Sequence, residues 1–110
     1  MRGYSSLGGI AALTTTISFL MTPAMAASPS EMRGKRFALT NCARCHAIDR
    51  VSQSPLEAAP PFRDLHRRYP VDTLAEAMVE GLSTGHPSMP EFHLDPDQVN
   101  DLISYLKSLE

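Results

Sequence analysis

The stretch Cys42-Ala43-Arg44-Cys45-His46 decides how this chain of 110 residues is to be interpreted. It gathers both cysteines of the sequence and one of its four histidines into a single short segment. A helical turn ending here would bring both sulfur atoms to one side and point the imidazole across the same face. This spacing is the attachment signature of a c-type haem, whose vinyl groups form thioether bonds with the two thiols while the imidazole binds iron. We therefore expect one haem c, attached covalently through Cys42 and Cys45, with His46 as an axial ligand.

Three other uses of the cysteine pair explain less. A thioredoxin-like redox pair needs a strand–helix–strand context, and the sequence shows no convincing strand. A structural disulfide would suit an exported protein, but it leaves the adjacent His46 without a role. A zinc site with four ligands would need a second pair of cysteines, which the chain lacks.

The composition favours a bound apolar group as well. The sequence is 43% hydrophobic, which argues against disorder, but it has no Trp and only 6% aromatic residues from which to build a core. Chains this small usually need a disulfide, a metal or a cofactor to complete their core. The net charge of −2 excludes the strongly basic surface that nucleic-acid binding requires.

The N-terminus has the pattern of a secretory signal peptide. Arg2 supplies a positive charge, and residues 3–30 carry none. Within them lies a short apolar run, 10–21, followed by the small residues Ala24 and Ala26 at the positions that precede a cleavage site. The sequence therefore predicts export to the periplasm of a bacterium.

We expect cleavage to remove residues 1–26 and to leave 27–110 as a single domain. An uncleaved membrane anchor is the alternative, because 7–27 is just long enough to span a bilayer. Gly, Thr, Ser and Pro dilute this run, so we predict no stable membrane insertion after cleavage.

Three helices are predicted in the mature chain. The first begins after Ser28, where Pro29 and Glu31 complete a capping-box pattern, and it continues to residue 40 or 41. The second is predicted from Asp72 as N-cap to about Glu80, with Gly81 as its stop.

The third helix follows Asp95 as its cap, with Pro96 in the first position and Gln98 in the third. Apolar residues then recur along one face with helical spacing, at Val99, Leu102, Ile103, Leu106 and Leu109. Residues 47–70 show no sustained period and contain four prolines, which indicates a mostly extended or turn-rich connection. A connection this long is better explained if it covers a bulky group. The predicted fold class is all-α.

Over residues 28–110 the chain resembles the small class I c-type cytochromes. The resemblance rests on four segments in a matching order: the Cys42–His46 stretch after a helix that contains Gly34, Ala59-Pro60-Pro61-Phe62, Ser88-Met89-Pro90-Glu91-Phe92, and the closing helix 98–109. It departs from the family at Ala38, where an aromatic residue is common, and at Ala59, where glycine is usual. The resemblance implies a cytochrome c-like fold, with three to four helices wrapped around the covalently attached haem.

The sixth ligand of the iron is less directly indicated by the residues. Met32, Met78 and Met89 are the methionines of the mature chain, and its histidines other than His46 are His66, His86 and His93. Met32 and Met78 have the helical spacing of core residues, and His66 lies in a basic surface segment. Met89 lies instead between Pro87 and Pro90, which restrict its backbone. The resemblance selects Met89, with His86 and His93 as the alternatives.

The resemblance also implies two packing relationships. The carbonyl of Pro60 should accept a hydrogen bond from the ring of His46, which fixes the orientation of that ligand. Gly34 should let the first helix cross the last one closely, against Tyr105 or Leu102. A third observation comes from charge, since residues 27–68 sum to +4 and residues 69–110 to −7. This asymmetry indicates either a solvated surface or a dipolar carrier that is steered towards its partners.

These features predict an electron carrier and not an enzyme. Ligation by His46 and Met89 closes both axial positions of the iron, which favours electron transfer over oxygen or peroxide chemistry. The expected partners are redox proteins: a donor dehydrogenase or cytochrome complex, and an acceptor oxidase or reductase. The alternatives are an electron-accepting haem subunit of a periplasmic dehydrogenase or oxidase complex, and a sensor or peroxidase with an open sixth site.

Overall fold

The computed structural model describes residues 3, 8–9, 16–81 and 88–110. These residues form three α-helices and one short 3₁₀ helix, in the order α1 (Pro29–Asn41), η1 (Phe62–Arg67), α2 (Val71–Glu80) and α3 (Pro96–Ser108). No strand occurs within these ranges. The predicted all-α fold is confirmed.

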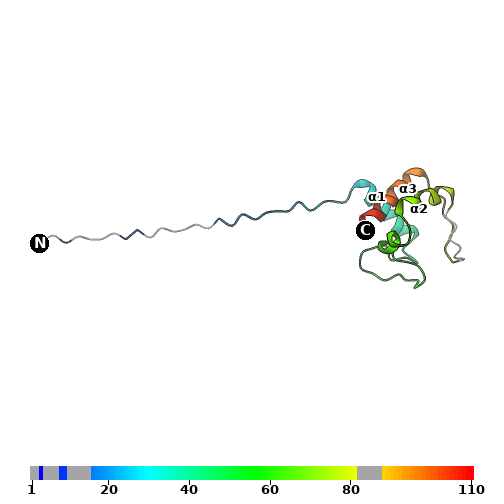
Figure 1. Cartoon of the computed structure of the whole chain (residues 1–110), viewed down its shortest axis with the longest axis horizontal. Helices are drawn as coiled ribbons and strands as arrows, with labels where there is room; N and C mark the ends of the chain where they lie inside the picture. The colour runs from blue at the N-terminus through cyan, green and yellow to red at the C-terminus, as the bar shows by residue number, and fades with distance from the viewer. Residues whose placement is uncertain (1–2, 4–7, 10–15, 82–87) are drawn as a thin grey trace.

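Residues 16–27, before α1, run away from the helices as an extended chain (Figure 1). These residues are all exposed. No helix in the described ranges has both the length and the apolar character needed to cross a membrane. The signal peptide predicted over 1–26 lies partly outside the described residues, and its cleavage stays a prediction.

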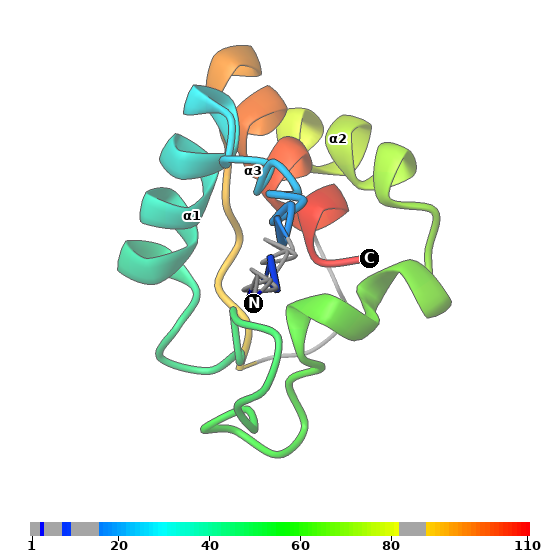
Figure 2. The ribbon, with the colours of Figure 1, turned by 90° about the vertical axis from the view of Figure 1, so that its left-hand side faces the viewer.

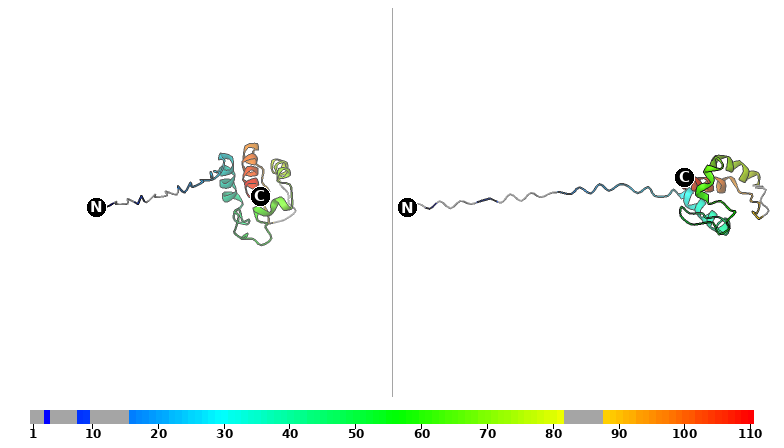
Figure 3. Two further views of the ribbon diagram at one scale, coloured as in Figure 1. Left: turned by 60° about the vertical axis from the view of Figure 1, so that its left-hand side comes forward. Right: turned by 60° about the horizontal axis from the view of Figure 1, so that its bottom comes forward.

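The last helix lies at the centre of the fold. Figure 2 and the left view of Figure 3 show α3 between α1 and α2, with the connection from 47 to 61 at one end of the helices. The face of α3 predicted from its periodicity is buried, and Leu106 is its most enclosed side chain at 2% exposure. The core therefore forms on both sides of α3, against α1 and α2.

The helices α1 and α3 approach each other at a glycine. Gly34 is buried, and a Cβ atom there would overlap the backbone carbonyl of Asp101 and lie 2.9 Å from Cβ of Tyr105. The close crossing that the resemblance implied is confirmed, with Tyr105 rather than Leu102 as the neighbouring side chain. Ala38, one turn further along α1, is completely buried in the core.

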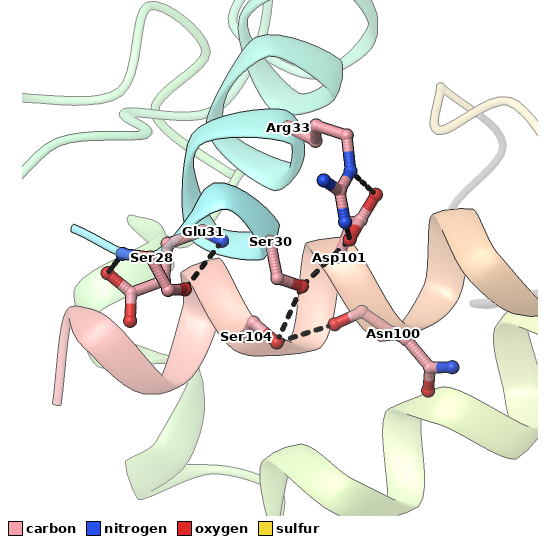
Figure 4. A network of polar contacts seen from close by, with 7 residues as sticks. All are labelled: Ser28, Ser30, Glu31, Arg33, Asn100, Asp101 and Ser104. Atoms are coloured by element: carbon pink, nitrogen blue, oxygen red, sulfur yellow. Dashed lines mark hydrogen bonds and ion pairs between the residues drawn. The ribbon is translucent and has the colours of Figure 1, made fainter.

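Polar side chains reinforce this crossing at the edge of the core (Figure 4). The guanidinium of Arg33 donates to both carboxylate oxygens of Asp101, from Nε at 2.7 Å and from Nη2 at 2.8 Å. The hydroxyl of Ser30 donates to the same carboxylate at 2.7 Å and lies 3.1 Å from Oγ of Ser104. A bidentate ion pair of this kind fixes direction as well as distance, so it sets how α1 lies along α3.

Local capping signals gave two of the three helix starts correctly. Ser28 accepts a hydrogen bond from the backbone N–H of Glu31, and the backbone N–H of Ser28 donates to the Glu31 side chain. At α3 the backbone N–H of Asp95 donates to Oε1 of Gln98 at 3.1 Å. Both predicted caps are confirmed. They could be predicted because their hydrogen bonds are made within one turn of the chain.

The predicted cap of α2 is wrong. The helix begins at Val71 after Pro70, whose carbonyl accepts hydrogen bonds from both the hydroxyl and the N–H of Thr73. Asp72 lies inside the first turn, and its carboxylate pairs with Nζ of Lys107 on α3 at 2.6 Å. The Asp72 side chain therefore forms an ion pair with α3 instead of capping α2. The predicted stop at Gly81 is confirmed, with a φ of 103°.

The connection 47–70 is mostly irregular, as predicted, and η1 is the regular element that it contains. One expectation needs correction. Met32 is not a core residue: it is 59% exposed, since the buried positions of α1 are Gly34 and Ala38 and Met32 projects from the opposite side. Met78 does pack against the core as expected.

Candidate functional site

The cysteine pair lies in a turn that continues directly from α1. The N–H of Cys42 donates to the carbonyl of Ala38 at 2.8 Å, and the N–H groups of Cys45 and His46 then donate back to the carbonyl of Cys42. Both thiols are free and half-buried. The last helical hydrogen bonds of α1 thus pass into a tight turn, which brings the backbones of Cys42, Cys45 and His46 together.

The Cys42 thiol is set in an apolar environment. Burial raises its pKa to about 11. Desolvation disfavours a charged thiolate, so at neutral pH this sulfur is held as a thiol.

The ring of His46 is oriented by a backbone carbonyl. Its Nδ1 lies 2.8 Å from the carbonyl oxygen of Pro60, which is the contact that the resemblance implied. A carbonyl oxygen can only accept, so the hydrogen must be on Nδ1. The lone pair of Nε2 is therefore left free to bind a metal ion, and the tautomer is fixed by the fold.

The Pro60 carbonyl is positioned by the start of η1. The N–H of Phe62 donates to the carbonyl of Ala47 at 2.9 Å, so the chain after Pro60 is bound to the chain after His46. The aromatic ring of Phe62 lies 5.3 Å from the His46 ring, centroid to centroid. Ala59, which departs from the glycine common in the family, is buried and fits this turn with 7% exposure.

The other ligand candidates differ in their surroundings. Met89 is half-buried in a turn, and Phe92 just beyond it packs against the core. His66 is exposed on η1, while His93 is exposed and lies against Gly81 with its Nε2 3.4 Å from a carboxylate oxygen of Glu91. His86 lies outside the described residues.

Hydrogen bonds connect four of the five predicted site residues, and Met89 is the fifth. Cys42, Cys45, His46 and Pro60 form one cluster through the hydrogen bonds given above. Among the described residues, no hydrogen bond or aromatic contact connects Met89 to this cluster. Its assignment as a ligand therefore stays a prediction.

Two residues near the site were not singled out as site residues by the sequence. The hydroxyl of Tyr105 donates to the carbonyl of Ile48 at 2.6 Å and is buried. The guanidinium of Arg63 donates to backbone carbonyls of the turn that follows Ile48. Tyr105 could have been suspected from its position beside the apolar stripe of α3, but Arg63 lies in a segment without any periodic pattern.

The residues present fit a covalently attached haem. One tight turn carries two free thiols and an imidazole with an available Nε2, and such a donor set is that of a haem c. Apolar side chains from η1, α2 and the chain before α3 are only partly buried against the core, and these are Leu65, Leu74, Ala75, Met78 and Phe92. They supply apolar surface for a macrocycle.

The helical fold and this donor set define a haem-binding protein. The family model of cytochrome c matches residues 31–110, and the chain belongs to the cytochrome c family. The chain is similar to a cytochrome c-553-like protein of Synechocystis sp. (strain ATCC 27184 / PCC 6803 / Kazusa), with 31% identity over 77 residues, 70% of this chain and 67% of that protein. No solved structure matches the chain. The family implies a covalently bound haem c, for which Cys42 and Cys45 have the required spacing.

Proposed function

We propose that the protein is a periplasmic carrier of single electrons, with a haem c held by Cys42 and Cys45 and ligated axially by His46 and Met89. Membership of the cytochrome c family and the similarity to a cytochrome c-553-like protein support a haem electron carrier rather than an enzyme. The haem would supply a one-electron change of its iron. The observation that carries the proposal is the His46–Pro60 contact of 2.8 Å, because it presents Nε2 to the metal in a fixed orientation.

The chain's own residues account for the properties that a carrier needs. The hydrogen bond to Pro60 restricts rotation of the His46 ring, so this residue would present Nε2 to the iron in one orientation. The tight α1–α3 crossing at Gly34 gives a rigid frame, which would keep the structural change on electron transfer small. The turn that contains Met89 is followed by Pro90, whose fixed φ limits the movement of the thioether.

The charge asymmetry supports protein partners for this carrier. Residues 27–68 sum to +4 and residues 69–110 to −7, and both Arg67 of η1 and the acidic residues of α2 are exposed. A dipole of this kind orients a protein during encounter and raises its association rate. We expect a donor dehydrogenase or cytochrome complex and an acceptor oxidase or reductase.

Expression with an intact leader, followed by analysis of the exported protein, tests the proposal. We expect a mature chain that begins near residue 27, one covalently bound haem per chain, and a reversible one-electron redox titration. Carbon monoxide should not bind to the reduced protein at equilibrium, because both axial positions are filled. Rapid binding of carbon monoxide would contradict the carrier and favour a protein with an open sixth site.

A further inference from the structure

Arg63 ties η1 to the chain that follows His46. Its Nη1 donates to the carbonyl of Ser52 at 2.7 Å and to the carbonyl of Asp49 at 3.4 Å. Its side chain thus reaches two backbone acceptors of one turn, although the two residues lie 11 and 14 positions earlier in the sequence. A planar guanidinium is suited to such a grip, because it presents several donors in a fixed arrangement.

The turn that Arg63 holds is itself well ordered. The Asp49 carboxylate accepts hydrogen bonds from the hydroxyl and the N–H of Ser52, both at 2.6 Å, and from the N–H of Val51 at 2.8 Å. These bonds lower the pKa of Asp49 to about 2, so the carboxylate stays ionised. The preceding Ile48 carbonyl is bound by the Tyr105 hydroxyl on α3. Arg63 is therefore attached to a turn that the core already supports.

Three successive links connect this turn with the start of η1. The first is the His46–Pro60 contact, and the second is the hydrogen bond from the Phe62 N–H to the Ala47 carbonyl. The third link is the pair of hydrogen bonds from Arg63, the residue after Phe62, to the backbone of the turn. These links follow one another along the segments 46–52 and 60–63. The hydrogen bonds of Arg63 therefore limit how far Pro60 can move relative to His46.

We propose that Arg63 is a positioning residue for His46, which keeps the Pro60 carbonyl aligned with the Nδ1–H group of the imidazole. The inference rests on the proposed function, in which Nε2 of His46 binds haem iron. A hydrogen bond at Nδ1 makes the imidazole a stronger donor at Nε2. A stronger donor favours the ferric state and lowers the reduction potential. By keeping the Pro60 carbonyl hydrogen-bonded to His46, Arg63 therefore lowers the reduction potential.

The sign of the potential shift separates this role from a simple charge effect. Removing a positive charge near the haem by itself stabilises ferric iron, which is the more positive state, and lowers the potential. Weakening the Nδ1 hydrogen bond has the opposite effect, because the imidazole then donates less to iron. The two explanations of an Arg63 variant therefore predict shifts in opposite directions.

Arg67 provides a matched control on the same helix. It carries the same charge, its side chain is 72% exposed, and it pairs with Asp64 at 3.3 Å. Arg63→Leu and Arg67→Leu would be prepared as haem-loaded proteins beside the parent. Nuclear magnetic resonance would measure solvent exchange of the His46 Nδ1 hydrogen, and a redox titration would measure the midpoint potential.

We expect Arg63→Leu to accelerate exchange at His46 Nδ1 and to have a higher midpoint potential than Arg67→Leu, while Arg67→Leu retains the parental exchange rate. An exchange rate at His46 that is unchanged in Arg63→Leu, or a potential no higher than that of Arg67→Leu, would overturn the proposal. If Arg63→Leu does not fold, Arg63→Lys replaces it and Arg67→Lys replaces the control, so that both variants keep the charge and the same two criteria apply. Failure of the proposed function would be visible earlier, in a parent protein without covalent haem or without a reversible titration.

Discussion

The backbone carbonyl of Asp101 on α3 occupies the space in which a Cβ atom on Gly34 of α1 would lie. The obstacle is backbone rather than the end of a flexible side chain, and Cβ of Tyr105 closes the other side at 2.9 Å. The two helices can therefore meet at this distance only if residue 34 has no side chain. The same approach places Arg33 and Ser30 within reach of the Asp101 carboxylate.

A valine at this position should separate the helices. Gly34→Val is expected to destabilise the fold by about 3 kcal/mol, because overpacking against backbone cannot be relieved by a rotamer change. For a domain of this size that corresponds to a fall in Tm of more than about 10 °C. Thermal unfolding followed by circular dichroism measures it, and the haem spectrum of the folded protein should be unchanged.

Lys35→Val serves as the control for this substitution, because it puts the same β-branched residue at an exposed position of α1. Its effect should be limited to helix propensity, about 0.5 kcal/mol. Equal stability of Gly34→Val and Lys35→Val would show that the crossing tolerates a side chain and would contradict the assignment.

The Arg33–Asp101 pair should make stability depend on pH at the acid end. Hydrogen bonds from Arg33 and then Ser30 hold the pKa of Asp101 below its ordinary value. A carboxyl whose pKa is lowered on folding contributes its full stability above the unfolded pKa and loses it as the pH falls through the folded pKa. We expect Asp101→Asn to be less stable than the parent at pH 7, with a difference in Tm that shrinks on acidification below the ordinary carboxyl range. Parallel Tm profiles of the two proteins would contradict this.

The identity of the sixth ligand can be tested at Met89. Met89→Ala is expected to abolish the absorbance band near the red edge of the spectrum that marks a thioether bound to ferric iron. It should also lower the midpoint potential, because thioether ligation raises it. Met32→Ala is a suitable control, since Met32 is 59% exposed on α1 and should leave band and potential unaltered. If the parent lacks the band, or Met89→Ala keeps it, Met89 is not the ligand.

Gly81 is expected to be intolerant of any side chain for two separate reasons. Its φ of 103° is a conformation that other residues rarely adopt, which costs about 1 to 3 kcal/mol for alanine. A Cβ there would also meet the ring of His93 and lie 2.7 Å from Oε1 of Glu91. Chemical denaturation should show Gly81→Ala to be destabilised.

A double variant separates the two contributions at Gly81. Combining Gly81→Ala with His93→Ala removes the obstruction by the ring but leaves the backbone strain and the contact with the flexible Glu91 side chain. We expect the pair to recover part of the lost free energy of unfolding and not all of it. Full recovery would mean that the positive φ costs nothing at this position.

The parts of the fold that the sequence predicted are those fixed within a few residues. The caps at Ser28 and Asp95 and the stop at Gly81 depend on neighbours in the chain, so their patterns could be read directly. Asp72 was mistaken for a cap because its carboxylate serves Lys107 of another helix. A partner that distant in the sequence leaves no local pattern.

The candidate site divides in the same way. Cys42, Cys45 and His46 were identifiable because attachment of a haem requires consecutive positions in the sequence. The helix η1 was missed, since a 3₁₀ helix of six residues is too short to show a hydrophobic period. Arg63 was missed for a related reason, because its acceptors are backbone carbonyls, which any residue supplies.

The pairing of the first helix with the last one has a consequence for the order in which the protein matures. The bonds between α1 and α3 reach Asp101, 68 and 71 residues further along the chain, so they cannot form until the C-terminal residues have been synthesised. Until then Gly34 lacks its contact with the backbone of Asp101, and the core that α1 and α3 share is incomplete. The helix that stands first in the chain is therefore among the last to acquire its tertiary contacts, because its partner is synthesised at the end.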